Sequence, residues 1–163
     1  MFPRILAVAA LLLAAPLLSF ADDAAVTAGD LTITKAWTRE APPRARVGGG
    51  YLTITNNGSR ADRLIGGAAP FAGRVEIHEM AVTDGVMRMA PVAGGLEIAP
   101  GATVELKPGG FHVMFMGLTE PPAEGDTVPV TLRFERAGAV TVSMPVAGVG
   151  AKTMDHSGMK HGG

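Results

Sequence analysis

Histidine and methionine side chains are the groups in this sequence whose type and spacing could do chemistry. The chain has four His and nine Met, one of which is the first residue. Seven of them lie within residues 78–116 (His78, Met80, Met87, Met89, His112, Met114 and Met116), and four within residues 154–161 (Met154, His156, Met159 and His161). Met144 is the one other internal methionine. Methionine is a common filler of gaps in protein cores, but packing alone does not explain this clustering.

Strand parity separates these side chains from the predicted core. In residues 111–116, His or Met stands at every even position, whereas Phe or Val stands at every odd one. Side chains alternate between the two faces of a strand, so the sulfur and imidazole groups would share one face and the core-forming groups the other. Residues 75–80 repeat the pattern, with His78 and Met80 opposite two β-branched residues. A methionine used only for packing would join the Phe and Val face instead.

A predicted hairpin brings two of the segments together. The Asp-Gly pair at residues 84–85, between two alternating runs, is a strong signal for a two-residue turn. With this loop, Met80 faces Met89, and His78 becomes a diagonal neighbour of Met89, about 7–8 Å away at the backbone. A third strand that carries His112 beside this hairpin would gather two imidazoles and at least two thioethers in one place.

Soft, neutral ligands of this kind select Cu(I). Thioether sulfur suits Cu(I) and scarcely suits Zn(II), Mg(II) or Ca(II), and imidazole suits copper as well. Because thioethers do not form disulfides, such a site tolerates an oxidising compartment. A ligand set without thiolate should also hold the ion less tightly than a cysteine pair, which fits delivery better than retention. The other interpretation of the cluster is a structural Met/His patch without metal.

Composition excludes several other kinds of site and partner. The formal net charge is −1, so no basic surface field calls for nucleic acid. Cysteine is absent, which excludes disulfides, thiolate zinc sites, iron–sulfur clusters, thiol nucleophiles and blue-copper centres. The sequence has no arguable Ser/His/Asp triad, P-loop or dinucleotide fingerprint, and the glycines at 48–50 precede a strand rather than a helix. We therefore expect a binding protein and not an enzyme.

The first 21 residues have the features of a secretory signal peptide. Arg4 precedes an apolar run over residues 5–18, and Ser19 and Ala21 supply the small residues that a signal peptidase reads. Cleavage after Ala21 would leave a mature chain without a membrane span, located in the periplasm of a host with two membranes.

The segments that must position the cluster are predicted strands. Glycine and proline account for 22 and 12 residues, and no long run with helical period appears. Alternating runs predict strands at 31–34, 51–55, 75–80, 86–89, 104–106, 111–116, 128–134 and 140–146. Pro129 and Pro145 fall in the last two, which predicts a free edge or a bulge there. Trp37, the one tryptophan, is expected to anchor the core.

These strands predict one all-β domain, an antiparallel Greek-key β-sandwich or barrel. We place it at residues 30–147, after a flexible lead-in at 22–29. Residues 148–163 have almost nothing to bury and are expected to form a disordered tail rich in Met and His.

The order and spacing of the four central residues resemble the signature of the PCuAC family of periplasmic copper(I) chaperones. Ten residues separate His78 from Met89, and one separates His112 from Met114. Similarity to the family also extends over residues 61–64, 73–80, 106–110 and 114–118, and so over nearly the whole mature domain. The resemblance implies a cupredoxin-like β-barrel that binds Cu(I) through His78, Met89, His112 and Met114.

The resemblance also implies a role in carrying Cu(I) towards assembly of the copper centre of cytochrome oxidase. The implied partners are the copper ion and either cytochrome c oxidase subunit II or another periplasmic copper chaperone. Some members have Met directly after the first His, where this chain has Glu79 followed by Met80. Met80 is therefore a candidate additional ligand, as are Met87 and Met116.

The C-terminal tail is similar to the Met- and His-rich extensions of some members of that family. As a second, flexible copper site, Met154 and Met159 would suit Cu(I), whereas His156 and His161 would suit Cu(II) as well as Cu(I). The alternative is a solvated tail without metal.

Three other functional classes compete with a copper chaperone. A periplasmic copper-sequestering or resistance protein without specific handover would use the same ligands. A copper enzyme is disfavoured because an all-neutral, Met-containing site favours Cu(I) and opposes redox cycling. A metal-free adhesive module would share the fold and leave the His/Met cluster unexplained.

Overall fold

The computed structural model describes residues 25–154 of the chain. Over this range the chain has no helix, and so none with the length and apolar character needed to cross a membrane. The described strands are β1 (Val26–Ala28), β2 (Leu31–Arg39), β3 (Val47–Asn56), β4 (Asp62–Ala69), β5 (Ala72–Thr83), β6 (Val86–Pro91), β7 (Leu96–Ile98), β8 (Thr103–Leu106), β9 (Phe111–Leu118), β10 (Thr127–Phe134) and β11 (Gly138–Ala147).

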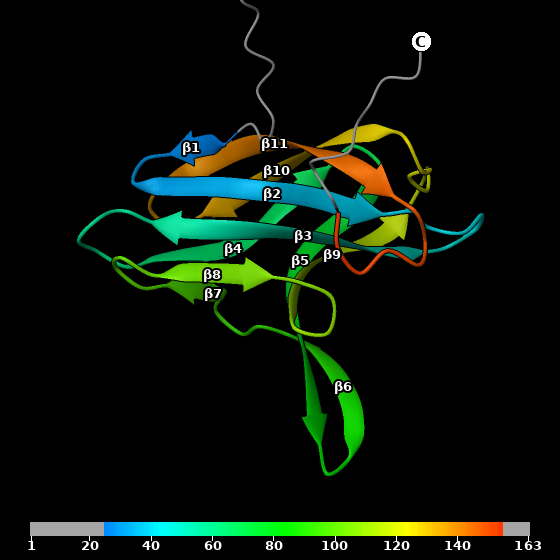
Figure 1. The fold of residues 1–163 in the computed structure, drawn as a ribbon, viewed down its shortest axis with the longest axis horizontal. Helices are drawn as coiled ribbons and strands as arrows, with labels where there is room; N and C mark the ends of the chain where they lie inside the picture. The colour runs from blue at the N-terminus through cyan, green and yellow to red at the C-terminus, as the bar shows by residue number, and fades with distance from the viewer. Residues whose placement is uncertain (1–24, 155–163) are drawn as a thin grey trace, which may run out of the picture.

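Seven of these strands close into a barrel (Figure 1). Around the ring the order is β2-β11-β10-β4-β5-β9-β3, and β3 pairs with β2 to complete it. Neighbours such as β5 and β9 are distant in the sequence, as in a Greek-key arrangement. This confirms the all-β prediction. One pairing, β11 with β2, is parallel, because a closed ring with an odd number of strands cannot be antiparallel throughout.

Alternating apolar side chains fill the barrel interior. The largest fully buried ones are Leu31, Ile33, Leu52, Ile54, Leu64, Ile98, Leu106, Val113, Phe115, Leu132, Phe134 and Met144. The rings of Phe71 and Phe115 meet edge to face, with their centroids 5.0 Å apart. In β9, Val113 and Phe115 belong to this core cluster, whereas His112 and Met114 do not. The parity predicted for this strand is therefore correct.

The three consecutive glycines of β3 make room for bulky neighbours. A Cβ at Gly50 would lie 3.0 Å from the Phe115 ring and 3.3 Å from the Met144 sulfur. On the other face, a Cβ at Gly49 would lie 3.0 Å from the Tyr51 hydroxyl. The glycine run therefore serves packing on both sides of the strand.

Both prolines predicted to need a free edge have one. Pro129 pairs with Ser143 of β11, but β10 pairs with β4 only from Thr131 onward. Pro145 lies just before Val146, where the pairing of β11 with β2 begins. Neither proline ring therefore removes a donor that a second neighbouring strand needs.

Three strands were not predicted from the sequence. β4 contains two glycines and two alanines in succession, which have low strand propensity. β1 and β7 have only three residues each. Because β1 pairs with β2, the ordered domain begins before residue 30, inside the segment predicted to be a flexible lead-in.

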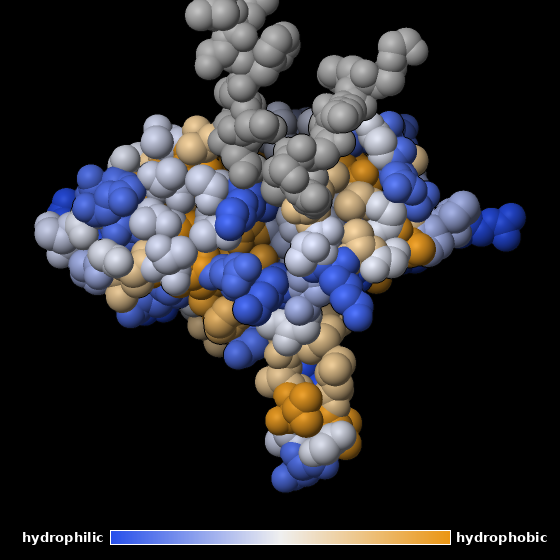
Figure 2. Space-filling model, viewed as in Figure 1, coloured by the Kyte–Doolittle hydropathy of each residue, from blue (hydrophilic) through white to orange (hydrophobic). Residues whose placement is uncertain are grey.

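The outer part of β5 and the whole of β6 form an arm that extends from the barrel (Figure 1). Asp84 and Gly85 have φ angles of 53° and 74°, as the predicted two-residue turn requires. Met80 pairs with Met89, so the predicted hairpin register is correct. Large apolar side chains are exposed along this arm, namely Val82, Val86, Met87 and Met89. Figure 2 shows the resulting hydrophobic surface on the arm.

Candidate metal site

The pairing of β5 with β9 brings the two domain histidines together. His78 and His112 are direct register partners, and their ring centroids lie 5.9 Å apart. Both residues are buried, with 7% and 5% of their surfaces exposed, although they face away from the main core. The β5–β6 hairpin and β9 are therefore the three adjacent strands that the sequence analysis required.

The His112 ring is oriented by a backbone carbonyl and approaches a methionine of the arm. Its Nδ1 lies 3.0 Å from the Gly110 carbonyl oxygen, which can only accept a hydrogen bond. Nδ1 therefore carries the proton in the neutral ring, and Nε2 keeps its lone pair. Nε2 lies 3.1 Å from the Met89 sulfur, which β6 supplies. These two atoms are close enough for one soft ion to contact both.

The His78 ring is oriented by a carboxylate. Its Nε2 lies 2.8 Å from an oxygen of Glu76, two residues earlier on the same strand face. Its Nδ1 is buried and has no hydrogen-bond partner. Arg74 contacts the other oxygen of Glu76 at 2.6 Å. The hydrogen bond with His78 lowers the pKa of the Glu76 carboxyl, and the Arg74 charge acts in the same direction.

Burial keeps the second histidine neutral. Removal from water lowers the pKa of His112 below its ordinary value of 6.5, because the charged form loses solvation. The hydrogen bond to Gly110 opposes this shift, and the neighbouring His78 adds to it. A neutral imidazole is the form that binds metal, so this ring is ready for ligation near neutral pH.

Four further methionines near the two histidine rings differ in their burial and in their neighbours. Met114 is 9% exposed, lies on the His112 face of β9 and pairs with Glu76. Met80 is half-buried and pairs with Met89 at the base of the arm. Met87 lies farther out on the arm and is 64% exposed. The Met116 sulfur contacts the Arg74 guanidinium at 3.4 Å.

An aromatic pair lies on the outer face of β3, on the same side of the sheet as Met114. Trp37 is buried as expected, but it packs on Tyr51 outside the main core cluster, with ring centroids 4.6 Å apart. The Tyr51 hydroxyl lies over Gly49, whose register partner is Met114. Burial raises the pKa of Tyr51, against the opposing charge of Arg39.

Two residues near the site were missed in the sequence analysis. Glu76 is a polar residue in an alternating run, which ordinarily marks only the solvent side of a strand. Its spacing of two from His78 was the available signal for a shared face. Tyr51 gave no signal, because its pairing with Trp37 follows a bulge in β2 that becomes evident only when the strands are paired.

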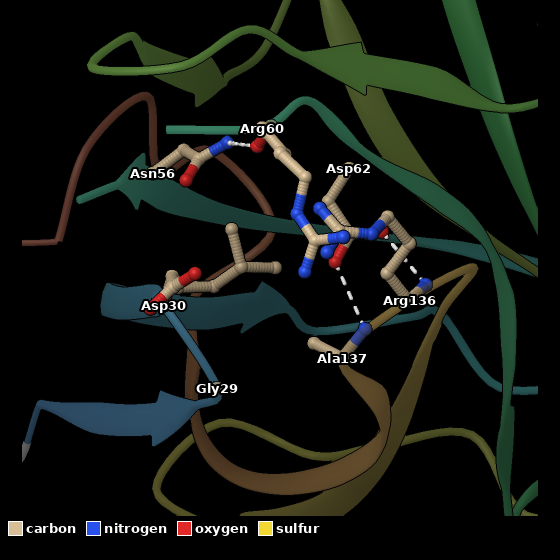
Figure 3. Close-up of a pocket in the computed structure, with 8 residues that line it drawn as sticks. Gly29, Asp30, Asn56, Arg60, Asp62, Arg136 and Ala137 are labelled. Atoms are coloured by element: carbon tan, nitrogen blue, oxygen red, sulfur yellow. Dashed lines mark hydrogen bonds between the residues drawn. The ribbon is translucent and has the colours of Figure 1, made fainter. Parts of the chain in front are cut away.

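The structure holds a pocket elsewhere that has different chemistry (Figure 3). It is lined by Gly29, Asp30, Leu31, Asn56, Arg60, Asp62, Arg136 and Ala137, without a histidine or methionine. Asp62 accepts hydrogen bonds from the backbone nitrogens of Arg136 and Ala137, both at 2.9 Å. Within residues 25–154, no group of three or more His, Asp or Glu could hold a metal ion. The candidate metal site is the His/Met cluster, in which a histidine nitrogen and a methionine sulfur approach each other.

The predicted tail site lies mostly outside the described residues. Met154 is within them, whereas His156, Met159 and His161 are not.

Sequence comparison finds a family model and a relative that match the part of the chain that forms the barrel. A family model described as "Putative lipoprotein LpqE-like" matches residues 31–146. The putative lipoprotein Lxx21020 of Leifsonia xyli subsp. xyli is 31% identical over 119 residues, which cover 73% of this chain and 70% of that protein.

Solved structures with the same fold include copper-binding domains. The copper-bound PCuAC domain from PmoF2 superposes with a TM-score of 0.65 at 25% identity, over 76% of this chain and 97% of that domain. The Cu(I) form of DR1885 from Deinococcus radiodurans gives a TM-score of 0.53 at 33% identity, over 69% and 74% of the two chains.

Proposed function

The chain belongs to the LpqE-like family of putative lipoproteins, and we propose that it is a Cu(I) metallochaperone and not an enzyme. Copper binding is supported by its likeness to the copper-bound PmoF2 domain and to the Cu(I) form of DR1885. We place its action in the periplasm, after removal of residues 1–21, because the N-terminal sequence has the features of a secretory signal and its relatives are described as lipoproteins.

The proposed ligands are His78, Met89, His112 and Met114. The observation that carries this proposal is the 3.1 Å approach of His112 Nε2 to the Met89 sulfur. Packing alone does not explain a methionine at position 89 of the arm, since 47% of the surface of Met89 is exposed. Two imidazoles and two thioethers match the preference of Cu(I) for soft and borderline neutral ligands.

The half-exposed Met89 also supports transfer of the ion to a partner. Ligand exchange requires that an incoming side chain reach the metal, and the other three proposed ligands are each at most 9% exposed. We propose that the acceptor approaches along the β5–β6 arm and replaces Met89 first. Cytochrome c oxidase subunit II or another periplasmic copper chaperone is the proposed recipient. The tail copper site remains a separate prediction.

Titration with Cu(I) against a competing chelator tests the proposed ligands. The double variant His112→Ala, Met114→Ala should lose most of its affinity for Cu(I). Met144→Leu is the matched control, because Met144 lies fully buried in the barrel interior and a Met-to-Leu exchange keeps its volume. Undiminished Cu(I) affinity in the double variant would show that the ion does not bind at the proposed site.

Deletion of the gene separates delivery from sequestration. If the protein delivers copper, the deletion strain should lose cytochrome oxidase activity at low copper and tolerate excess copper normally. Copper sensitivity with normal oxidase activity would instead identify a sequestering protein without handover.

A further inference from the structure

We propose that Glu76 is a positioning residue that makes His78 bind Cu(I) through Nδ1, whereas His112 binds through Nε2. This inference rests on the proposed function, since it concerns the orientation of two of its ligands. The two imidazoles would thus present opposite ring nitrogens to one ion. A carboxylate holds one ring and a backbone carbonyl holds the other.

The contact between Glu76 and His78 determines which nitrogen is free. An ionised carboxylate only accepts hydrogen bonds, so at 2.8 Å it fixes the proton of the neutral ring on Nε2. Nδ1 then carries the lone pair. The backbone carbonyl of Gly110 acts in the same way on the other ring, but at the opposite nitrogen.

The free nitrogen of His78 lacks any other role in the described chain. Its Nδ1 is buried without a hydrogen-bond partner, which costs free energy in a folded protein. Buried polar atoms that remain unpaired therefore call for an explanation such as a bound ion. A metal ion on Nδ1 would satisfy this atom, just as the Met89 sulfur marks the direction of the lone pair on His112.

Glu76 is itself held in place by a chain of contacts across two strands. Arg74 Nε lies 2.6 Å from Glu76 Oε1, which leaves Oε2 for the histidine. The same guanidinium contacts the Met116 sulfur on β9 at 3.4 Å. Met116 thus extends this chain of contacts from β5 to β9. The carboxylate also places a negative charge beside a ligand set that has none of its own.

A carboxylate on the far nitrogen of a metal-binding imidazole fixes the ring orientation and raises the basicity of the bound nitrogen. Removal of such a partner lowers metal affinity by about 10–100-fold. Glu76→Ala should therefore weaken Cu(I) binding by this factor. Glu76→Gln should lose less affinity than Glu76→Ala, because its carbonyl oxygen still accepts a hydrogen bond from His78. Glu79→Ala is the matched control, because it removes a carboxylate from the same strand at an exposed position on the opposite face.

Nitrogen-15 NMR of the imidazole rings provides the direct readout, because it distinguishes the two tautomers. In the apo protein we expect His78 protonated at Nε2 and His112 at Nδ1. Addition of Cu(I) should shift the resonances of His78 Nδ1 and His112 Nε2. Glu76→Ala should leave the backbone spectrum of the barrel intact while the tautomer of His78 becomes mixed.

The outcomes distinguish this inference from the proposed function. If Cu(I) shifts the nitrogen resonances of both rings, but the shifted nitrogen of His78 is Nε2, the inference is overturned and the proposed function stands. Unchanged affinity and an unchanged His78 tautomer in Glu76→Ala would also overturn it. If Cu(I) shifts neither ring in the wild-type protein, the proposed site itself fails.

Discussion

At the scale of single residues, the candidate site joins soft neutral ligands to groups that fix their protonation. His112 is buried and donates its Nδ1 proton to Gly110, which leaves Nε2 free beside the Met89 sulfur. Glu76 takes the corresponding role for His78. The chemistry of the site therefore depends on ring tautomers as much as on the identity of the ligands.

The affinity for Cu(I) should decrease as the pH falls, because an imidazole must be neutral to bind the ion. A depressed pKa keeps His112 neutral at pH values where an exposed histidine, with a pKa of about 6.5, would already be charged. Chelator competition over a pH series measures this, and His112→Ala should flatten the profile. An affinity that stays constant into strong acid would show that no histidine binds the ion.

The two methionines of β6 should differ in their importance. Met89→Leu removes the sulfur next to His112 and should weaken Cu(I) binding more than about tenfold, or 1.4 kcal/mol. Met87→Leu makes the same exchange two residues away on the exposed arm and should have little effect. Equal losses in the two variants would contradict the assignment of Met89.

At the scale of the strands, the site depends on the registers of β5 with β6 and of β5 with β9. The first register could be predicted, because a two-residue Asp-Gly turn sets every pair of its hairpin. The second could not, since β5 and β9 are far apart in the sequence and no turn links them. The pairing of His78 with His112, and hence the role of Glu76, became evident only from the structure.

The turn of the arm should affect copper binding without being near the ligands. Gly85 has a positive φ, which a β-branched residue rarely adopts, so Gly85→Val should strain the turn and shift the strands of the arm. No atom lies close enough to clash with the new Cβ, so the backbone conformation alone causes this strain. We expect weaker Cu(I) binding, measured by chelator competition. Gly138→Val is the matched control, because Gly138 has a similar φ and open surroundings at the start of β11. Retention of full affinity in Gly85→Val would show that the arm does not position Met89.

At the scale of the whole molecule, the barrel separates stability from binding. The main core, the glycine run of β3 and the Asp62 hydrogen bonds maintain the fold, while the His/Met cluster lies outside the main core cluster. The all-β class could be predicted because alternation and turn residues are local signals. A barrel was one of the two predicted architectures, but the order and number of strands in its ring could not be predicted, because the ring includes the unpredicted β4 and one parallel pair.

Loss of the Asp62 carboxylate should therefore destabilise the protein and spare the metal site. This buried side chain accepts hydrogen bonds from the backbone nitrogens of Arg63, Arg136 and Ala137. Asp62→Ala should lower the free energy of unfolding by about 2–3 kcal/mol, because it leaves donors unpaired. Denaturant unfolding measures this loss, and Cu(I) affinity of the folded variant should be unchanged. A stable variant would contradict the role given to Asp62.

X-ray absorption at the copper edge, on the protein loaded with one equivalent of Cu(I), tests the central claim most directly. The account predicts a shell of two nitrogen and two sulfur neighbours, with one sulfur lost in Met89→Leu and one nitrogen lost in His78→Ala. A shell without sulfur, or one that these substitutions leave unchanged, would contradict it.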